Sequence, residues 1–512
     1  MEAPIVRERT RCEASKPGYQ KPNDMIQWLM DNNSKQERPR SFEELAQLRL
    51  LTEGGLDTKK AFDSMIKMDS FMKKSQRLSP PSLRDVVRIS PNELSFASVE
   101  SWKAIYGHPS AGRHTMIKSE FYDMYGSGFD SLCVGSERQP KEHTRMRKSL
   151  APAFSTKALM EQEQIVQRCV DGFVERLGEE GTKGGGLNMT KWFEMLAFDI
   201  LGEMAFGETF HCVESGKPHH WSEMITEHLF FITVLDNLRR YPIIAAIGKV
   251  LLPKVTVSVR NTHSQFSRDK VTRRIESKTA RKDFLTNIVD KVESGEVSRE
   301  EMTAHASTLI IAGGETVATF LAATTFHLLK NPPVYTKLRN EIRERFKNIS
   351  DIDALSAQQL PYMQAVISEG LRIYPPGSQG FPRLSPGAEI NGRYVPSGQT
   401  EVYTSAWTIT HDARYFHDPY AFKPERWLDP NCTDVKDASQ PFSLGPRGCL
   451  GRNAPLTFSF AYVEICLILA KMHHAYDLEL LDPNLDWEGE SSLHVMWWKP
   501  ELPVRFLRRE GV

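Results

Sequence analysis

The chain has 512 residues, with 65 basic and 65 acidic side chains, 40% apolar residues and 25% charged residues. This balance is that of an ordinary globular protein with a large core. A nucleic-acid-binding protein usually carries a basic excess, so the formal charge of zero argues against nucleic acid as a partner.

The cysteines and the hydropathy exclude further classes. Seven cysteines are scattered along the chain, and none forms the close pair that a zinc site needs. An odd number without a framework favours a reducing compartment. No run of about 18 apolar residues occurs, so we expect no transmembrane segment. The apolar stretch from Leu229 to Pro253 is interrupted by charges, which favours a surface or pocket-lining segment.

The first feature along the chain is a weak internal repeat. The sequence from Asn23 to Asp31 resembles that from Lys282 to Asp290, and Arg77-Leu-Ser-Pro-Pro81 resembles Arg372-Ile-Tyr-Pro-Pro376. Two unrelated amphipathic helices would give the same impression, so both interpretations stay open. We treat residues 1–83 as a partial copy without an obvious core of its own, and 84–512 as the main domain.

A basic motif, His143-Thr-Arg-Met-Arg147, comes next. On a helix, a spacing of four residues places His143 and Arg147 on one face. Both side chains can donate hydrogen bonds to carboxylates. A solvated basic face is the alternative interpretation.

Helical patterns dominate from about 155 to 375, and one helix is unusually clear. Ser298-Arg-Glu-Glu301 predicts a capping box, and Asn331-Pro-Pro333 predicts the end of the helix. About 30 residues at about 1.5 Å each give a rod of roughly 45 Å, which must run through the core.

This helix contains the sequence Ala312-Gly-Gly-Glu315-Thr316. Each glycine costs about 1 kcal/mol against alanine in a helix interior, which makes sense if something large presses against the helix there. Glu315 and Thr316 could then relay protons. A local kink with a solvated glutamate is the alternative.

The next motif, Glu369-Gly-Leu-Arg372, places two opposite charges on one helix face; a surface ion pair is its ordinary interpretation. From Pro375, tight turns separate short predicted strands at Arg393–Val395 and Glu401–Ser405. Another helix is expected near Ala461–His473. The fold class is therefore mainly α with a small β part.

The strongest signal is Phe442-Ser-Leu-Gly-Pro-Arg-Gly-Cys-Leu-Gly451, with its cysteine at position 449. Glycines allow a tight turn and leave amides pointing at the sulfur of Cys449, which tunes a metal-bound thiolate. Arg447 supplies a fixed positive fork that suits a carboxylate. A lone cysteine is most often an inert buried thiol, but that interpretation leaves this loop unexplained.

These four motifs, in this order, resemble the cytochrome P450 family over about Arg84 to Val512. Pieces such as Val86–Leu94 and Leu201–Gly207 are similar to fungal members, which often serve secondary metabolism. The resemblance implies a P450-like helical fold, with a long central distal helix and a proximal cysteine loop. It also implies haem b (iron protoporphyrin IX) as cofactor, with Cys449 as the thiolate ligand of the iron.

The resemblance assigns roles to the remaining motifs. Glu315 and Thr316 should be the acid–alcohol pair on the distal helix. The haem propionates should be held by His143, Arg147, Arg383 and Arg447. A structural ion-pair network without a part in the chemistry should consist of Glu369, Arg372 and Arg426.

The implied reaction is a monooxygenase reaction (hydroxylation, epoxidation or desaturation) on an apolar small molecule. It uses O2 and electrons from an NADPH-dependent diflavin reductase, which should dock on the cysteine side of a monomer. Substrate contacts are expected from about Tyr106 to Leu132, Leu229 to Ile244, the helix before Thr316, and Gly377 to Phe381. The family's location is the endoplasmic reticulum surface. Without a transmembrane segment, we expect peripheral membrane contact or a cytoplasmic location.

The sequence departs from the family in three places. We expect residues 1–83 to provide no membrane anchor. The partial copy has Lys74-Ser-Gln-Arg77, with lysine where the family has an acid, and Ala454–Ser459 is expected to be an insert after the cysteine loop. These departures support an alternative: an inactive pseudoenzyme, haem-binding or haem-free, from a fused or mis-spliced gene. A helical scaffold without cofactor would leave the cysteine loop unexplained.

Overall fold

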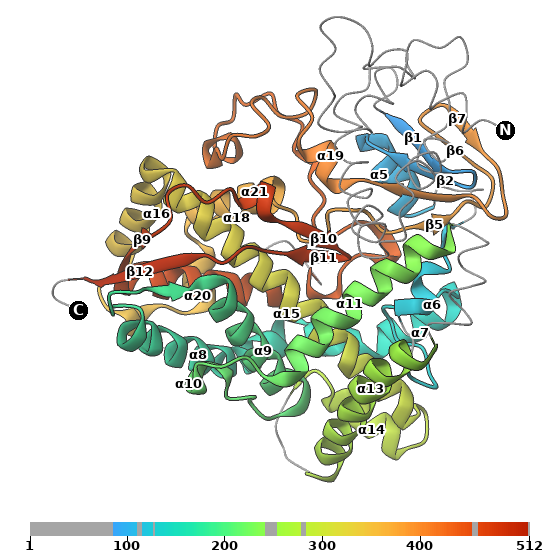
Figure 1. Ribbon diagram of the computed structural model, residues 1–512, viewed down its shortest axis with the longest axis horizontal. Coiled ribbons are helices and arrows are strands. Elements are labelled where there is room, and N and C mark those ends of the chain that lie inside the picture. Colours follow the sequence, from blue (N-terminus) through green and yellow to red (C-terminus); the bar gives the residue numbers. More distant parts are fainter. Residues whose placement is uncertain are drawn as a thin grey trace, which may run out of the picture.

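The computed structural model describes residues 85–109, 115–125, 128–240, 253–277, 283–452 and 459–509. The predictions for residues 1–83 and for the insert at 454–458 lie outside these ranges, and of the insert only Ser459 is described. The described chain is mainly helical, with small sheets at separate places in the molecule (Figure 1), which confirms the expected fold class. The helices are α5 (Val99–Tyr106), α6 (Phe121–Tyr125), α7 (Pro140–Leu150), α8 (Thr156–Glu180), α9 (Met189–Phe206), α10 (Cys212–Ser215), α11 (His220–Arg239), α13 (Pro253–Glu276), α14 (Thr286–Glu293), α15 (Arg299–Lys330), α16 (Pro332–Arg345), α17 (Ala354–Gln358), α18 (Pro361–Ile373), α19 (Ala406–Thr410), α20 (Phe460–Ala475) and α21 (Trp487–Glu490).

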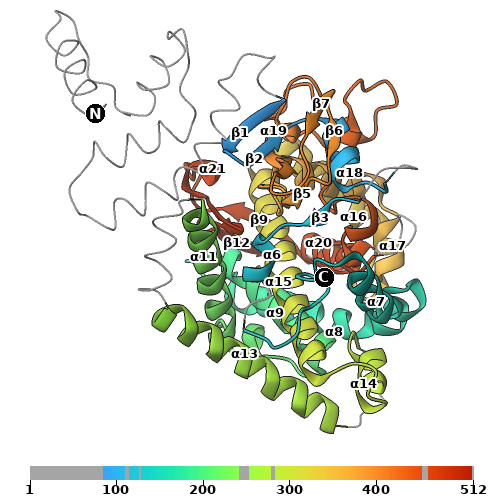
Figure 2. The same ribbon diagram turned by 90° about the vertical axis from the view of Figure 1, so that its right-hand side faces the viewer.

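The predicted long helix is α15, which runs through the middle of the molecule in both views (Figures 1 and 2). Ser298 caps it by accepting a 3.0 Å hydrogen bond from the amide of Glu301. The reciprocal half of the capping box was wrong, because the Glu301 carboxylate binds Arg145 at 2.7 and 3.0 Å instead. By length and composition α15 could cross a bilayer, but it is mostly buried inside the fold and belongs to the core.

Helix packing explains the glycine pair of α15. A Cβ atom on Gly313 would lie 2.9 Å from a methyl group of Leu201 in α9, while one on Gly314 would meet the same side chain at an ordinary 3.5 Å. The large group that presses on α15 at Gly313 is therefore a neighbouring helix. Gly370 of α18 makes a similar close approach, since a Cβ there would lie 2.3 Å from the hydroxyl of Thr324 in α15.

The β part joins distant segments. Strand order in the five-stranded sheet is β1 (Val86–Ser90), β2 (Glu93–Phe96), β8 (Glu401–Thr404), β5 (Arg383–Leu384) and β3 (Ile117–Lys118), with β2 and β8 parallel and the other pairs antiparallel. The smaller sheets are β4 (Leu187–Asn188), β12 (Pro503–Arg508) and β9 (Tyr476–Leu480); β6 (Ala388–Ile390) with β7 (Arg393–Val395); and β10 (Ser492–His494) with β11 (Met496–Trp498). Both predicted strands are confirmed as β7 and β8.

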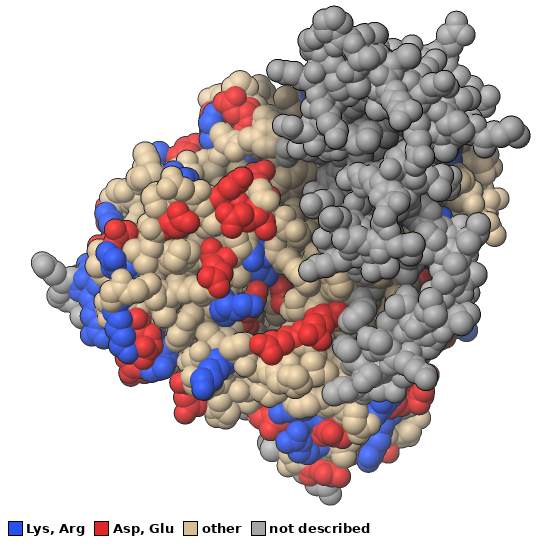
Figure 3. Space-filling model, in the orientation of Figure 1, with Lys and Arg blue, Asp and Glu red and all other residues tan. Residues whose placement is uncertain are grey.

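The charged side chains form no simple pattern on the face of the molecule drawn in Figure 3. Acidic and basic side chains alternate across the part of Figure 3 that the structure describes. This mixture agrees with the equal numbers of acidic and basic residues in the sequence.

Candidate active site

The cysteine loop folds as two short turns, η6 (Gly445–Arg447) and η7 (Leu450–Arg452), with Cys449 between them. Of the free cysteines in the described ranges, Cys449 is the exposed one, while the other five are buried or partly buried. The chain packed around its thiol raises the pKa of Cys449 by desolvation. The backbone amides of Gly451 and Arg452, which donate to the sulfur, oppose that shift. The loop thus offers an accessible sulfur whose charged form is already supported by amides.

Two contacts fix the position of this loop. The amide of Cys449 donates a 2.9 Å hydrogen bond to the carbonyl oxygen of Phe442. Arg147, on α7, donates a 2.6 Å hydrogen bond to the carbonyl oxygen of Gly448. Its positive charge also acts on the Cys449 thiol and favours the thiolate. Arg147 therefore contacts the cysteine loop, a contact that the sequence did not predict.

A cluster of basic side chains lies beside the loop. His143 and Arg147 share one face of α7, as predicted, while Arg383 starts β5 and Arg447 belongs to η6. Arg383 donates a 2.7 Å hydrogen bond to the hydroxyl of Tyr122, and Arg447 donates to two backbone carbonyls before α7. The structure therefore brings all four predicted propionate ligands into one region.

Sequence reasoning missed a fifth member of this cluster, Lys118. Lys118 in β3 pairs directly with Arg383 in the antiparallel strand β5. The Lys118 side chain is buried and donates to the carbonyl oxygens of Val134 and Gly135. A single lysine in a two-residue strand carries no motif, so only the strand pairing reveals this position.

The basic cluster holds more positive charge than the described chain neutralises. Burial first, and then the charges of neighbouring basic groups, together lower the pKa of His143 to about 3 and that of Arg447 to about 10. The pKa of Lys118 is lowered for the same two reasons, burial first. Glu137 is the acid that opposes these shifts at Lys118 and Arg447. Such a cluster suits a ligand with negative charge.

The middle of α15 presents two different faces. Ala312 is exposed although it lies mid-helix, and the hydroxyl of Thr316, one turn later, donates a 2.7 Å hydrogen bond to the Ala312 carbonyl. Glu315 points elsewhere, since its carboxylate lies 3.1 Å from the ammonium of Lys499. Adjacent helical residues do not share a face, so the two predicted catalytic side chains make separate contacts.

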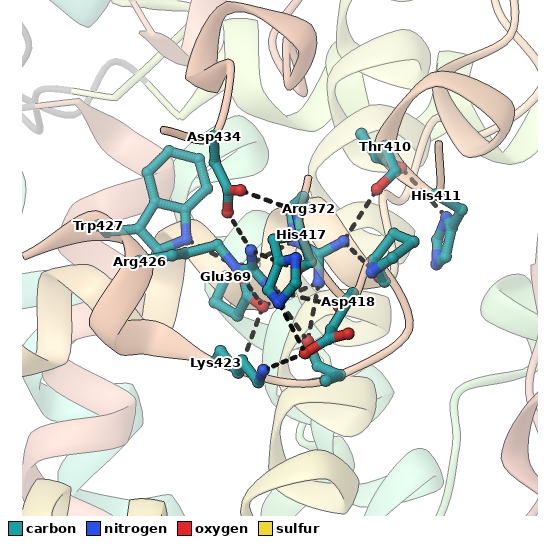
Figure 4. Close-up of polar contacts among 12 residues, drawn as sticks. Glu369, Arg372, Thr410, His411, His417, Asp418, Lys423, Arg426, Trp427 and Asp434 are labelled. Carbon is teal, nitrogen blue, oxygen red and sulfur yellow. Dashed lines mark hydrogen bonds and ion pairs between the residues drawn. The ribbon is translucent and has the colours of Figure 1, made fainter. Parts of the chain in front are cut away.

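The predicted ion-pair network is buried and fully engaged. Glu369 accepts two 2.8 Å hydrogen bonds from Arg372 and one of 3.1 Å from Arg426, and Figure 4 shows it between these two arginines. The indole of Trp427 donates a further 2.9 Å hydrogen bond to the same carboxylate. Arg426 also binds Asp434. The surface-pair alternative is wrong, because the side chains of Glu369 and Arg372 are both 0% exposed.

The comparisons with known proteins identify this arrangement. A family model described as Cytochrome P450 matches residues 114–501. Over 427 residues the chain is 62% identical to the cytochrome P450 monooxygenase ORF9 of Penicillium roqueforti, an alignment that covers 83% of this chain and 82% of the relative. It is 55% identical over 425 residues to the cytochrome P450 monooxygenase BOT4 of Botryotinia fuckeliana, covering 82% and 79%.

The chain belongs to the cytochrome P450 family. This P450 is a monooxygenase, an oxidoreductase whose cofactor is haem b. The residues described above fit that group. Haem carries two propionates, and the basic cluster provides an excess of positive charge beside the thiol of Cys449. His143 is buried on the same face of α7 as Arg147.

A cavity between α11 and the five-stranded sheet draws on three of the four segments expected to contact substrate. Its wall includes Phe121, Thr233, Asn237, Gln379, Tyr403 and Val495. A different cavity, with Tyr106, Arg383 and Arg447 in its wall, lies at the basic cluster itself. Within the described chain α15 adds nothing to the lining of the first cavity, and residues 241–244 of the expected contacts lie outside the described ranges.

Two bidentate ion pairs close one side of this cavity. Arg239, the last residue of α11, donates to Glu401 of β8 at 2.7 and 2.8 Å. Arg240 donates to Glu93 of β2 at 2.8 Å through two nitrogens. Asp236 accepts from both arginines. Together these contacts tie the end of α11 to the five-stranded sheet.

Proposed function

We propose that this P450 oxidises an apolar small molecule in fungal secondary metabolism, by hydroxylation, epoxidation or desaturation. Cys449 is the thiolate ligand and the metal ligand in this proposal. The observation that carries it is the accessible Cys449 thiol, with two amides donating to its sulfur, beside a buried basic cluster. Thiolate ligation favours cleavage of the bond in O2, which is the chemistry that haem supplies when bound.

The proposal assigns a role to the residues of the basic cluster and to the pair on the distal helix. Lys118, His143, Arg147, Arg383 and Arg447 hold the haem propionates. Arg147 also fixes the loop through Gly448. Glu315 and Thr316 move protons on the distal helix, with Thr316 on the face that carries the exposed Ala312.

The cavity supports a substrate with both apolar and polar groups. Phe121 and Val495 provide apolar wall, while Asn237, Gln379 and Tyr403 provide hydrogen-bonding groups. Gln379 is half-buried in this wall, and its side-chain amide can both donate and accept hydrogen bonds. A substrate with an apolar skeleton and one oxygen-containing group could contact both the apolar and the hydrogen-bonding side chains of this cavity.

Electrons reach the protein from an NADPH-dependent diflavin reductase that docks on the Cys449 side of a monomer. We further propose a location at the endoplasmic reticulum surface. The only candidate span in the described chain, α15, is mostly buried in the core, so the proposed membrane contact is peripheral.

The direct test is turnover of purified protein with diflavin reductase, NADPH and O2 against a panel of apolar natural products. A product that gains one oxygen atom, labelled when 18O2 is supplied, or that loses two hydrogens, is the expected result. Cys449→Ser is the control that should abolish it. Complete lack of product from every panel member, in protein with thiolate-ligated haem, would contradict the proposed oxygenase function.

A further inference from the structure

Three aromatic side chains from distant parts of the chain lie in mutual contact inside the fold. The ring of Trp497 in β11 packs on that of Tyr374, which directly follows α18, with 4.6 Å between the centroids. Trp407 in α19 contacts both rings, with 5.5 Å to Trp497 and 6.2 Å to Tyr374. These spacings are typical of aromatic pairs in direct contact. All three side chains are buried.

The inner end of this group adjoins the substrate cavity and the distal helix. Trp497 follows closely after Val495, which lines the cavity. The carbonyl oxygen of Trp497 accepts a 3.4 Å hydrogen bond from Lys499, whose ammonium also binds α15. The amide of Trp407 donates a 3.1 Å hydrogen bond to the carbonyl oxygen of Ser378, in a segment that is expected to contact substrate. The group therefore lies beside the region where oxygen is used.

A histidine continues the contact toward solvent. The imidazole of His411, which directly follows α19, stacks on the Trp407 ring with 4.0 Å between the centroids. Its Nδ1 atom lies 2.9 Å from the carbonyl oxygen of Trp407, which fixes the orientation of the ring. The ring of Tyr420 lies 5.0 Å from that of His411, and Tyr420 is 47% exposed. We call Trp497, Trp407, His411 and Tyr420 the aromatic relay.

The two kinds of side chain in the relay that can be oxidised differ in what they need. Tryptophan and tyrosine both give up one electron readily, but tyrosine also releases its phenolic proton when it does so. Tyr374 is shielded from water: its hydroxyl donates a 2.7 Å hydrogen bond to Ser491, and burial raises its pKa. The half-exposed Tyr420 can give its proton directly to water. The outer end of the relay is therefore the place where an electron and a proton leave together.

We propose a further activity for this P450: the aromatic relay carries electrons from the surface toward the haem, where they reduce peroxide when no substrate is bound. Two electrons and two protons turn O2 into hydrogen peroxide. A monooxygenase that receives electrons while its cavity is empty thus has an oxidant without a substrate. The reductant is a small electron donor of the ascorbate class. The activity requires the haem cofactor but not the substrate oxidation of the proposed function.

Electrons and protons balance over two passes along the relay. In each pass Trp497 gives one electron toward the haem, Trp407 replaces that electron, and Tyr420 supplies the next one. Tyr420 loses its phenolic proton to water and becomes a neutral radical. Ascorbate then returns one electron and one proton to Tyr420. After two passes one hydrogen peroxide has taken up two electrons and two protons to give two water molecules, and one ascorbate has become dehydroascorbate.

The test looks for the radical at Tyr420 in purified, haem-loaded protein without substrate or reductase. The protein is mixed with hydrogen peroxide, frozen at once and examined by electron paramagnetic resonance. A second sample contains a nitroso spin trap, and mass spectrometry locates the trapped radical on a peptide. A tyrosyl signal, with the spin-trap adduct on Tyr420, is the expected result for the parent protein.

Matched variants decide whether the radical belongs to the relay. Tyr420→Phe should abolish the tyrosyl signal, whereas Tyr394→Phe, at a tyrosine of β7 that is 72% exposed, should keep it. Trp407→Phe retains an aromatic ring against His411 but resists oxidation, so it should abolish the signal as well. Its control is Trp192→Phe, because Trp192 on α9 is as buried as Trp407, each being 7% exposed. This control should keep the signal.

Oxidation of ascorbate by hydrogen peroxide measures the rate of the proposed activity. Tyr420→Phe should lower this rate and should lose its haem absorbance faster in peroxide, while Tyr394→Phe should behave like the parent. A tyrosyl signal that survives in Tyr420→Phe, or that does not form in the parent, would overturn the proposal. Equal losses in Tyr420→Phe and Tyr394→Phe would overturn it too.

Turnover with reductase, NADPH and O2 separates this proposal from the proposed function. A parent protein that oxidises a substrate but forms no radical at Tyr420 refutes the relay alone. A parent protein that forms the radical in peroxide but oxidises no substrate supports the relay and contradicts the proposed function alone.

Discussion

The carbonyl oxygen of Tyr106 lies 2.2 Å from the place where a Cβ atom on Gly445 would stand. Gly445 also has a φ of +66°, in the region that favours glycine. The end of α5 thus packs directly on the backbone of the cysteine loop, four residues before Cys449. Two independent constraints require glycine at this position.

Gly445→Ala should displace the cysteine loop and lower the amount of thiolate-ligated haem per protein. The matched control is Gly392→Ala, because Gly392 has a similar φ of +68° but open space where its Cβ would stand. Both variants share backbone strain of about 1–2 kcal/mol, and only Gly445→Ala adds the clash with Tyr106. Haem absorbance measures the amount of bound haem, and unfolding in denaturant measures the loss of stability. Equal behaviour of the two variants would contradict the close-packing argument.

The basic cluster predicts how tightly haem is held. Arg447→Met should speed transfer of haem to excess apomyoglobin roughly tenfold or more, since a charge-assisted hydrogen bond contributes about 1.5–3 kcal/mol. Arg176→Met is the control, because Arg176 pairs with Glu179 and Glu180 on its own helix α8. Transfer rates that change equally in the two variants would argue against propionate binding by Arg447.

The network around Glu369 predicts a large effect on stability. Glu369→Gln removes the charge between two buried arginines and should lower the free energy of unfolding by about 3–5 kcal/mol. Glu425 is next to Arg426 in the chain but forms an exposed pair with Lys337 and accepts a 2.9 Å hydrogen bond from Tyr362, so Glu425→Gln should cost about 1 kcal/mol or less. Urea titrations compare the two. Similar losses would show that the Glu369 network contributes no more than a surface pair.

Much of this site could be predicted because its residues occur in dense motifs. The cysteine loop, the His143–Arg147 pair and the long helix each carry local information, and the structure places them where the motifs indicated. The capping box was only half correct. The sequence shows that Glu301 can reach back to Ser298, but it does not show that Arg145 from α7 offers a charged partner.

What could not be predicted depends on contacts between distant segments. Lys118 joins the basic cluster through the pairing of β3 with β5, and Lys499 reaches Glu315 from the end of β11, 184 residues away. Neither lysine belongs to a motif. The glycine at 313 was expected to accommodate a large group, but only the packing of α9 shows that this group is Leu201.

A buried histidine predicts the pH dependence of stability. Burial lowers the pKa of His473 from 6.5 to about 3, so the folded protein holds it neutral while the unfolded chain protonates it. Above pH 6.5 the histidine is neutral in both states and does not affect stability. As pH falls from 6.5 toward 3, protonation of the unfolded chain lowers the free energy of unfolding, and by pH 5.5 the loss is about 1.4 kcal/mol. His473→Phe retains an aromatic ring beside Tyr335 but cannot take a proton. Its unfolding free energy should fall less between pH 7.5 and 5.5, and parallel curves for parent and variant would refute the prediction.

The carbon monoxide difference spectrum of the reduced, purified protein tests the central claim most directly. If Cys449 ligates the haem iron as a thiolate, the Soret band should be strongly red-shifted, and Cys449→Ser should lose that band while keeping a folded chain. Bound haem without the shifted band would contradict thiolate ligation by Cys449. A protein that binds no haem would contradict the proposed role of the basic cluster as well.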